Sequence, residues 1–186
     1  MKILAISGSP RPKGNTASLM KAVLDSAKNS DPTTEIIEYN INRLSCKGCQ
    51  GCLACKKPDI QTCVQQDDLS PVLEQMIEAD VWVLGTPVYM GHTSAQLKLL
   101  LDRMYCFTGP NRSVRIPEGK KCLFVITQGA AGDRHQDIMD LFSRFMSWRG
   151  VSTKFIRAAG LTLSPGFTPE TLEEAKELGR WIVREE

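Results

Sequence analysis

Five of the seven cysteines in this 186-residue chain lie within one short segment. From Cys46 to Cys55 a cysteine stands at every third position, and Cys63 follows after a gap. Repeated C-x-x-C spacing lets three thiolates converge on one iron-sulfur cubane while a fourth comes from farther along the chain. Two sets of three fit this spacing, Cys46/Cys49/Cys52 and Cys49/Cys52/Cys55. The spacing therefore indicates a [4Fe-4S] site without choosing between the two sets.

Zinc and free thiols are the alternatives for this segment. Structural zinc sites usually take two separated pairs of ligands rather than a tight run of four. The thiols could instead stay free or act in redox chemistry. Cys106 and Cys122 lie outside the run, and we expect both to be buried and unreactive.

A second segment with chemical potential begins at the N-terminus. Residues 3–6 form a short apolar run typical of a buried parallel strand. The next ten residues, 7–16, supply two glycines, two prolines, three hydroxyls, an amide and an arginine. Apolar residues then recur with helical spacing at Met20, Val23, Leu24 and Ala27. The pattern predicts a strand, a polar loop and a helix.

This loop is suited to a phosphate group. We expect Asn15 or Thr16 to be the N-cap, which directs the positive end of the helix dipole toward the loop. The loop has neither G-x-G-x-x-G nor G-K-[ST], so the dinucleotide and nucleoside-triphosphate fingerprints are absent. A single terminal phosphate is the ligand that remains, and an ordinary strand-to-helix turn is the alternative.

The elements that must position these two segments alternate along the chain. The sequence predicts strands at residues 3–6, 34–39, 80–84 and 122–127 and one within 151–163. It predicts helices starting at Asn15 or Thr16, at Asp67, Asp68 or Ser70 with Pro71, at a Thr93/Gln96 capping box, before Ile138, and at Thr168-Pro169. The expected buried positions of the last three helices are Leu97, Leu100, Leu101, Met104; Ile138, Leu141, Phe142, Phe145; and Leu172, Ala175, Gly179, Ile182.

This alternation predicts an α/β fold with a doubly wound parallel sheet of five strands and helices on both faces. The flavodoxin-like strand order 2-1-3-4-5 would bring the loops at residues 7–16 and 86–91 together at the switch point. We expect one domain over residues 1–186, with a cysteine-rich insertion at about residues 41–66.

The composition gives no sign of a polymeric partner. Charged residues make up 24% of the chain and the formal net charge is +2, which favours a small ligand over nucleic acid. The opening apolar run is too short for a signal peptide, and no segment approaches the length of a membrane span. We therefore expect a cytoplasmic protein with no membrane contact.

Residues Gly8-Ser9-Pro10-Arg11, with Gly14, Asn15 and Thr16, resemble the flavin phosphate loop of the flavodoxin-like NAD(P)H-dependent FMN reductases. The resemblance continues through the cysteine segment, residues 86–103 and residues 127–129. It implies that FMN is bound by Ser7, Ser9, Arg11, Gly14, Asn15 and Thr16 around the phosphate, by Pro87, Val88, Tyr89, Met90 and Gly91 along the ring, and by Thr127 and Gly129. No side chain is expected to act as a catalytic acid or base, because the chemistry occurs at flavin N5.

The cysteine segment resembles that of the iron-sulfur flavoproteins within this family. In that subgroup the fourth cysteine precedes an Asp-Asp pair by a few residues, as Cys63 precedes Asp67-Asp68. The resemblance implies that the metal ligands are Cys49, Cys52, Cys55 and Cys63. Cys46 is then a spare thiol.

Three functions are compatible with these resemblances. The first is an iron-sulfur flavoprotein that exchanges electrons with a small-molecule or protein redox partner such as ferredoxin. The second is a cluster-free NAD(P)H-dependent FMN or quinone reductase. The third is a non-enzymatic FMN electron carrier or thiol redox sensor. The family resemblance also implies a homodimer or homotetramer.

Several charged residues have structural interpretations as well as functional ones. Arg112 and Arg115 could meet the phosphates of a nicotinamide cofactor, be solvated or form subunit contacts. We expect Asp102 and Arg103 to form an ion pair or a subunit contact. His92 and His135 are expected to be solvated or locally hydrogen-bonded.

Overall fold

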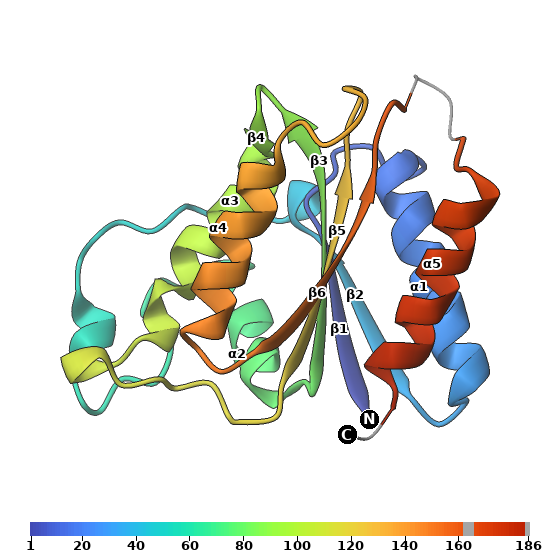
Figure 1. The fold of residues 1–186 in the computed structure, drawn as a ribbon. Coiled ribbons are helices and arrows are strands. Elements are labelled where there is room, and N and C mark those ends of the chain that lie inside the picture. The colour runs from blue at the N-terminus through green and yellow to red at the C-terminus, as the bar shows by residue number, and fades with distance from the viewer. Residues whose placement is uncertain (162–165, 185–186) are drawn as a thin grey trace.

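The computed structural model describes residues 1–161 and 166–184 and contains one mainly parallel sheet (Figure 1). The strands lie in the order β2-β1-β3-β5-β6, and the short β4 pairs antiparallel to β3. Their bounds are β1 Lys2–Ser7, β2 Glu35–Asn40, β3 Val81–Tyr89, β4 His92–Thr93, β5 Lys121–Thr127 and β6 Ser152–Ala158. The five parallel strands have the predicted flavodoxin-like order, so the first and third parallel strands lie side by side.

Helices cover both faces of the sheet, as predicted. Helices α1 and α5 lie on one face and α2, α3 and α4 on the other (Figure 1). The helices are α1 Asn15–Ser30, α2 Ser70–Glu78, α3 Ala95–Arg103, α4 Gln136–Ser147 and α5 Pro169–Ile182, with short 3-10 turns at Ile41–Arg43, Ala54–Lys56, Met104–Phe107 and Pro110–Arg112.

Alternate residues of each central strand supply the two cores. In β1, Ile3 and Ala5 pack in the core under α1 and α5. Leu4 and Ile6 pack in the core under α2, α3 and α4. All four are essentially inaccessible to solvent, as expected for a parallel strand covered on both faces.

Two glycines bring helices close to the ends of the central strands. A Cβ at Gly8 would lie 2.5 Å from Leu97 Cβ and 2.9 Å from the backbone nitrogen of Leu97. A Cβ at Gly85 would collide with the sulfur of Met20. The loop after β1 is therefore fitted tightly against α3, and β3 against α1.

Two of the predicted helix starts are wrong by one residue. Helix α1 is capped by Gly14 rather than by Asn15 or Thr16, because its first intrahelical bond runs from Ser18 N to Gly14 O. The other start is that of α3, where Ser94 replaces the predicted Thr93/Gln96 capping box.

Strand pairing decides the start of α3. Thr93 belongs to β4, where it pairs with Val88, and the Ser94 hydroxyl accepts from Leu97 N at 3.2 Å. The Gln96 amide instead donates to Asn42 Oδ1 at 3.1 Å. The predicted starts at Ser70-Pro71 and Thr168-Pro169 are confirmed.

Strand β3 is longer than predicted. Residues 85–87 continue the parallel pairing with β5, and Val88 and Tyr89 pair with β4 to form a hairpin. The expected loop at residues 86–91 is therefore mostly strand, and only Met90 and Gly91 form the turn. At the other edge, β6 ends at Ala158, and Leu163, the expected last residue of that segment, lies outside the described residues.

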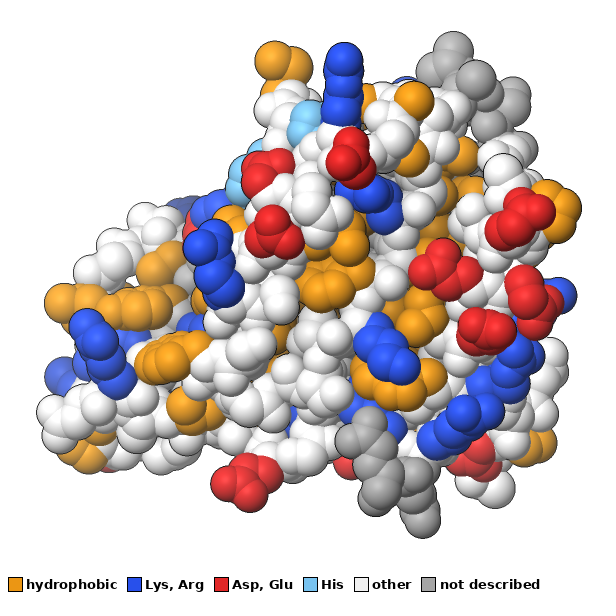
Figure 2. Space-filling model, viewed as in Figure 1, with side chains coloured by type: hydrophobic (Ala, Val, Ile, Leu, Met, Phe, Trp, Pro, Cys, Tyr) orange, Lys and Arg blue, Asp and Glu red, His pale blue; other side chains and the backbone are white. Residues whose placement is uncertain are grey.

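Two residues expected to be buried are on the surface. Leu141 in α4 is 47% exposed and Leu172 in α5 is 37% exposed. Met146 in α4 and Leu178 in α5 are buried. Both signs of charge are interspersed on the face that carries α4 and α5, with acidic side chains gathered over α5 (Figure 2). Among the described residues, no helix is long and apolar enough to cross a membrane.

Candidate functional site

A cavity of about 310 Å³ lies where β1, β3 and β5 end. Its walls come from the loop after β1, the start of α1, the end of β3, the loop after β5 and the segment after β6. The lining residues are Ser9, Arg11, Gly14, Asn15, Thr16, Pro87, Val88, Tyr89, Thr127, Gln128, Gly129 and Leu161. Ten of the thirteen residues expected to bind FMN therefore lie around one cavity.

The loop between β1 and α1 is held by its own hydrogen bonds. The Ser9 hydroxyl accepts from Arg11 N at 3.2 Å, and Gly14 N donates to Arg11 O at 3.1 Å. The Asn40 amide, at the end of β2, donates to Ser9 O at 3.1 Å. This fixed loop leads into the N-terminus of α1, whose first N–H groups have no partner within the helix and favour an anion.

A buried pair of hydroxyls joins two walls of the cavity. Thr16 Oγ1 and Thr127 Oγ1 lie 2.7 Å apart, and both residues are almost completely buried. Thr16 belongs to the first turn of α1, and Thr127 is the last residue of β5. The pair therefore sets the position of the helix N-terminus relative to the end of β5.

Sequence reasoning missed Gln128 and Leu161. The Gln128 amide donates to Ala130 O at 3.0 Å and Gly132 O at 3.3 Å. Its Oε1 is buried and has no hydrogen-bond partner within the described ranges 1–161 and 166–184, so it is an acceptor suited to a ligand N–H. Its position between Thr127 and Gly129 was the signal that could have found it.

Leu161 offered no comparable signal, because it is one apolar residue beyond the end of a strand. A backbone hydrogen bond from Leu161 N to Gln128 O at 3.1 Å brings it to the cavity. Such a contact between the ends of neighbouring strands depends on the tertiary fold.

Three of the expected FMN residues do not line the cavity. Ser7 is the last residue of β1, before the loop, and its hydroxyl accepts from Ser9 N at 3.2 Å. Met90 and Gly91 form the hairpin turn beyond β3, and Met90 is fully exposed. Ser7 supports the loop, whereas the two turn residues lie beyond the cavity wall.

The cysteine segment surrounds a much smaller cavity, of about 20 Å³. Cys49, Cys52, Cys55 and Cys63 all line it, and Cys106 joins them from the connection after α3. Thiols are the ligands that iron-sulfur clusters use, so the donor set fits such a group. Their sulfurs have not converged, because no three His, Cys, Asp or Glu side chains of the described chain lie close enough to hold a metal ion.

Two cations attach the middle of the cysteine segment to the connection after α3. Arg115 Nη1 donates to Cys55 O at 2.6 Å and to Cys106 O at 3.0 Å, and Nη2 donates to Lys57 O at 3.0 Å. Lys56 Nζ donates to Tyr105 O at 2.8 Å and lies 3.4 Å from the centre of the Tyr105 ring. The guanidinium of Arg115 therefore binds backbone carbonyls of the cysteine segment and is not directed at the FMN cavity, whereas Arg112 is exposed.

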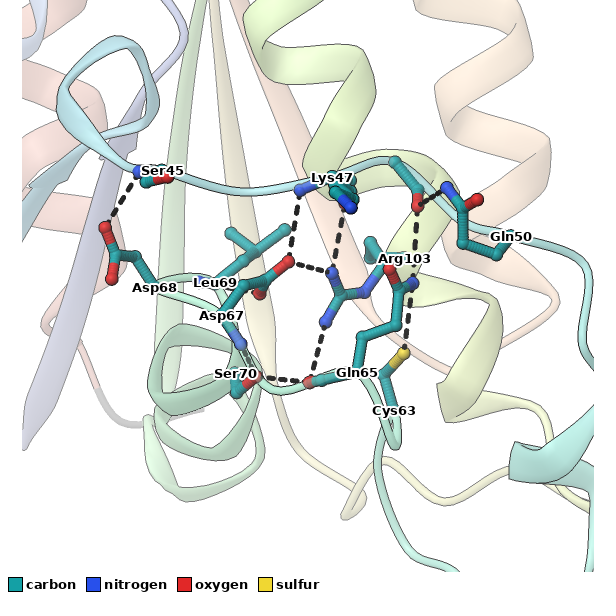
Figure 3. Close-up of polar contacts among 11 residues, drawn as sticks. Ser45, Lys47, Gln50, Cys63, Gln65, Asp67, Asp68, Leu69, Ser70 and Arg103 are labelled. Atoms are coloured by element: carbon teal, nitrogen blue, oxygen red, sulfur yellow. Dashed lines mark hydrogen bonds and ion pairs between the residues drawn. The ribbon is translucent and has the colours of Figure 1, made fainter.

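A buried ion pair holds the two ends of the cysteine segment together (Figure 3). Arg103 Nη1 donates to Asp67 Oδ2 at 2.8 Å and to Lys47 O at 3.0 Å, and the Arg103 side chain is completely buried. Burial alone would raise the pKa of Asp67, but the bonds from Arg103 and Lys47 N hold that pKa below its ordinary value. The expected pair of Asp102 with Arg103 is wrong, because Asp102 pairs with Lys98 at 2.5 Å on the exposed side of α3.

Burial makes several of the thiols poor nucleophiles. It raises the pKa of Cys106 to about 12, and it also raises the pKa of Cys55, which the nearby Lys56 partly offsets. Cys122 is fully buried in the core, and burial raises its pKa strongly. The expectation that Cys106 and Cys122 are buried is thus confirmed, and Cys49 and Cys52 are the exposed thiols of the segment.

Within residues 1–161 and 166–184, neither histidine is part of a catalytic arrangement. His92 Nδ1 lies 3.1 Å from Thr93 Oγ1 in the same hairpin, which agrees with a locally hydrogen-bonded side chain. His135 precedes α4 in a left-handed conformation.

Comparison with known proteins matches most of the chain to one family of sequences. A family model described as NADPH-dependent FMN reductase matches residues 1–174. An iron-sulfur flavoprotein of Methanocaldococcus jannaschii is 44% identical over 103 residues, which are 55% of this chain and 51% of the relative. An iron-sulfur flavoprotein of Archaeoglobus fulgidus is 29% identical over 186 residues, covering 98% of this chain and 79% of the relative.

The chain spans about half the length of the first of these relatives. Among solved structures, an NAD(P)H:quinone oxidoreductase from Methanothermobacter marburgensis superimposes with a TM-score of 0.75. That match has 16% identity and covers 100% of this chain and 98% of the other. At this identity the likeness is one of fold.

Proposed function

Because the chain belongs to the NADPH-dependent FMN reductase family, we propose that it binds FMN where β1, β3 and β5 end and works as an FMN-dependent oxidoreductase. The observation that carries this proposal is the single cavity lined by ten of the residues that the sequence singled out. A bound FMN would supply the redox chemistry, and the chain would supply binding, orientation and electrostatics.

The two ends of the cavity suit the two ends of FMN. We assign the phosphate to Ser9, Arg11, Gly14, Asn15 and Thr16, where hydroxyls, a guanidinium and the α1 N-terminus combine. We assign the ring to the wall of Pro87, Val88 and Tyr89, facing Thr127 and Gly129. Gln128 Oε1 would accept a hydrogen bond from the ligand. Ser7 then supports the phosphate loop, and Met90 and Gly91 border the entrance.

We further propose that Cys49, Cys52, Cys55 and Cys63 hold a [4Fe-4S] cluster. Their common cavity and the relatives named iron-sulfur flavoprotein support this assignment. The cluster would make the protein an electron-transfer flavoprotein, with a protein donor such as ferredoxin on one side and FMN on the other.

The second candidate is a cluster-free NAD(P)H-dependent FMN or quinone reductase. The unconverged thiols of the described residues favour it, as does the description of the family itself. In that case the cysteines would be free thiols or a zinc site. A carrier or thiol sensor without turnover is distinguished from this reductase by the absence of steady-state NAD(P)H oxidation.

Anaerobic purification followed by assays of FMN, iron and sulfide tests these assignments. We expect one FMN and about four iron atoms per chain, with a broad absorption band beneath the flavin peaks. Cys49→Ala and Cys63→Ala should lose the iron, whereas the matched control Cys46→Ala should keep it. A flavin spectrum without iron would contradict the cluster and leave the reductase, and absence of bound FMN would contradict the main proposal.

The setting of the protein is also a proposal. We propose that it works in the cytoplasm as a homodimer or homotetramer. Light scattering on the purified protein measures the assembly, and a monomer at micromolar concentration would contradict it.

A further inference from the structure

Arg103 lies between two parts of the cysteine segment that are far apart in sequence. Its guanidinium donates to Lys47 O on the N-terminal side and to Asp67 Oδ2 and Gln65 O on the C-terminal side, at 3.0, 2.8 and 3.4 Å. Figure 3 shows the side chain of Arg103 between these two loop segments. Asp67 also accepts from Lys47 N at 3.1 Å. One arginine on the rigid helix α3 therefore fixes the separation of the segment's two ends.

Gln65 connects the same two parts through its side chain. Its Nε2 donates to Gly48 O at 3.3 Å and to the sulfur of Cys63 at 3.8 Å (Figure 3). Gln50 donates to the same Gly48 carbonyl at 2.9 Å, and Figure 3 shows no bond between it and the sulfur of Cys63. Gln65 is thus an N–H donor to one of the four proposed ligands.

The guanidinium of Arg103 has one group left over. Its Nε is buried and has no hydrogen-bond partner among the residues that the structure describes. Arg103 also lines the cysteine cavity, together with Cys63. A fixed, buried positive charge with an unused N–H is suited to an anionic group in that cavity.

We propose that Arg103 and Gln65 are positioning residues of the cysteine site, which hold Cys63 in place and stabilise the negative charge of the group bound there. The inference rests on the proposed [4Fe-4S] cluster. Hydrogen bonds to the sulfurs and nearby charge both set the reduction potential of such a cluster. An added electron increases its negative charge, so a donor to Cys63 and a buried cation both favour the reduced form.

The test is a redox titration of the anaerobically purified holoprotein, followed by the absorbance of the cluster. Gln65→Leu keeps the size of the side chain and removes the N–H···S bond. Arg103→Lys keeps a positive charge, but it removes Nε and the guanidinium nitrogen Nη1, which donates to both Lys47 O and Asp67 Oδ2. Gln50→Leu is the matched control, because it loses a bond to the same Gly48 carbonyl and leaves the N–H···S bond from Gln65 to Cys63 in place.

We expect the midpoint potential to fall in Gln65→Leu and Arg103→Lys and to stay unchanged in Gln50→Leu. At a fixed potential, the ratio of reduced to oxidised cluster should drop by up to about tenfold, which corresponds to about 59 mV for one electron. Arg103→Lys should also release iron faster to a chelator, because the two ends of the segment are no longer joined.

The cluster and the positioning role of Arg103 and Gln65 can be overturned separately. A wild-type protein without iron and sulfide would overturn the cluster and this inference together. A loaded wild type whose potential equals that of Gln65→Leu would overturn the inference alone. Should Arg103→Lys fail to fold, the potential of Gln65→Leu relative to Gln50→Leu still decides the question.

Discussion

The hydroxyls of Thr16 and Thr127 are the clearest single contact between two walls of the proposed FMN cavity. Their oxygens lie 2.7 Å apart between the first turn of α1 and the end of β5, in a region with almost no solvent. A buried hydroxyl that loses its partner costs about 1–3 kcal/mol. This pair therefore couples the stability of the fold to the shape of the phosphate end of the cavity.

We expect Thr16→Val to weaken FMN binding by about tenfold, or about 1.4 kcal/mol. Valine matches threonine in shape but leaves Thr127 Oγ1 without its partner. Titration of the apoprotein with FMN, followed by quenching of flavin fluorescence, measures the change. Thr16→Ser keeps the hydroxyl and should stay close to the wild type; equal weakening in both variants would show that the methyl group, not the hydroxyl, is what matters.

At the scale of single residues, the sequence predicts those whose role follows from their type and place in a motif. Ser9, Arg11 and Thr16 line the cavity because a polar loop before a helix has few other arrangements. The sequence could not predict that Arg103 pairs with the distant Asp67 rather than with the adjacent Asp102. Adjacent residues of a helix face different directions, so the partner of Arg103 depends on how the distant segment folds back.

The connection between α1 and β2 illustrates how one element end is fastened. The Asp31 carboxylate accepts from Thr33 Oγ1 and Thr34 Oγ1, each at 2.6 Å, and from Thr33 N at 3.0 Å. The bonds from the Thr33 and Thr34 hydroxyls, with that from Thr33 N, lower the pKa of Asp31 from 3.8 to about 2. Thr34 is completely buried, so this turn fixes where β2 enters the sheet.

Because the pKa of Asp31 is lower in the folded state, its contribution to stability is complete above pH 3.8 and disappears as the pH falls toward about 2. We expect Asp31→Asn to have a lower melting temperature than the wild type at pH 7. The difference should shrink as the pH falls from about 4 to about 2. Thermal unfolding by circular dichroism across this range measures it.

Asp25→Asn is the control, since Asp25 pairs with Lys21 on the exposed side of the same helix. It should change the melting temperature much less at pH 7. A pH-independent difference between Asp31→Asn and the wild type would contradict the role of the charge.

At the scale of elements, the sequence located the five parallel strands and the five α-helices, but it missed the short β4 and some of the element ends. The segment 80–84 predicts the first part of β3, yet the strand continues to Tyr89 because β5 and β4 offer pairing partners there. For the same reason, Thr93 pairs with Val88 as part of β4, and Ser94 is the N-cap of α3. Strand ends depend on neighbours that a single segment does not contain.

At the scale of the whole molecule, the strand order could be predicted because alternating strands and helices leave few parallel topologies. The cysteine segment could not be placed in this way, because it lacks hydrophobic periodicity. Its position depends on the side chains of Lys56, Arg103 and Arg115, which attach it to α3 and the connection after α3. The organisation into one domain with an inserted cysteine segment stays a prediction.

The two proposed sites are built from separate parts of the chain, and none of the described residues lines both cavities. In Figure 1 the cysteine segment extends outward beside α3, away from the ends of β1 and β5. One contact near the start of that segment reaches the phosphate loop, the bond from Asn40 to Ser9 O. Asn40 is the last residue of β2 and is held by the sheet. We therefore expect its bond to Ser9 O to remain when a bound cluster is lost.

We therefore expect Cys63→Ala to lose its iron while keeping one FMN per chain and a wild-type affinity for FMN. Conversely, Thr16→Val should bind FMN more weakly and keep its full iron content. Assays of iron, sulfide and FMN on the same anaerobic samples measure both halves of this prediction. Loss of FMN from Cys63→Ala would mean that the cysteine segment supports the flavin cavity. That result would contradict the prediction that the segment lies beside the sheet and does not shape the flavin site.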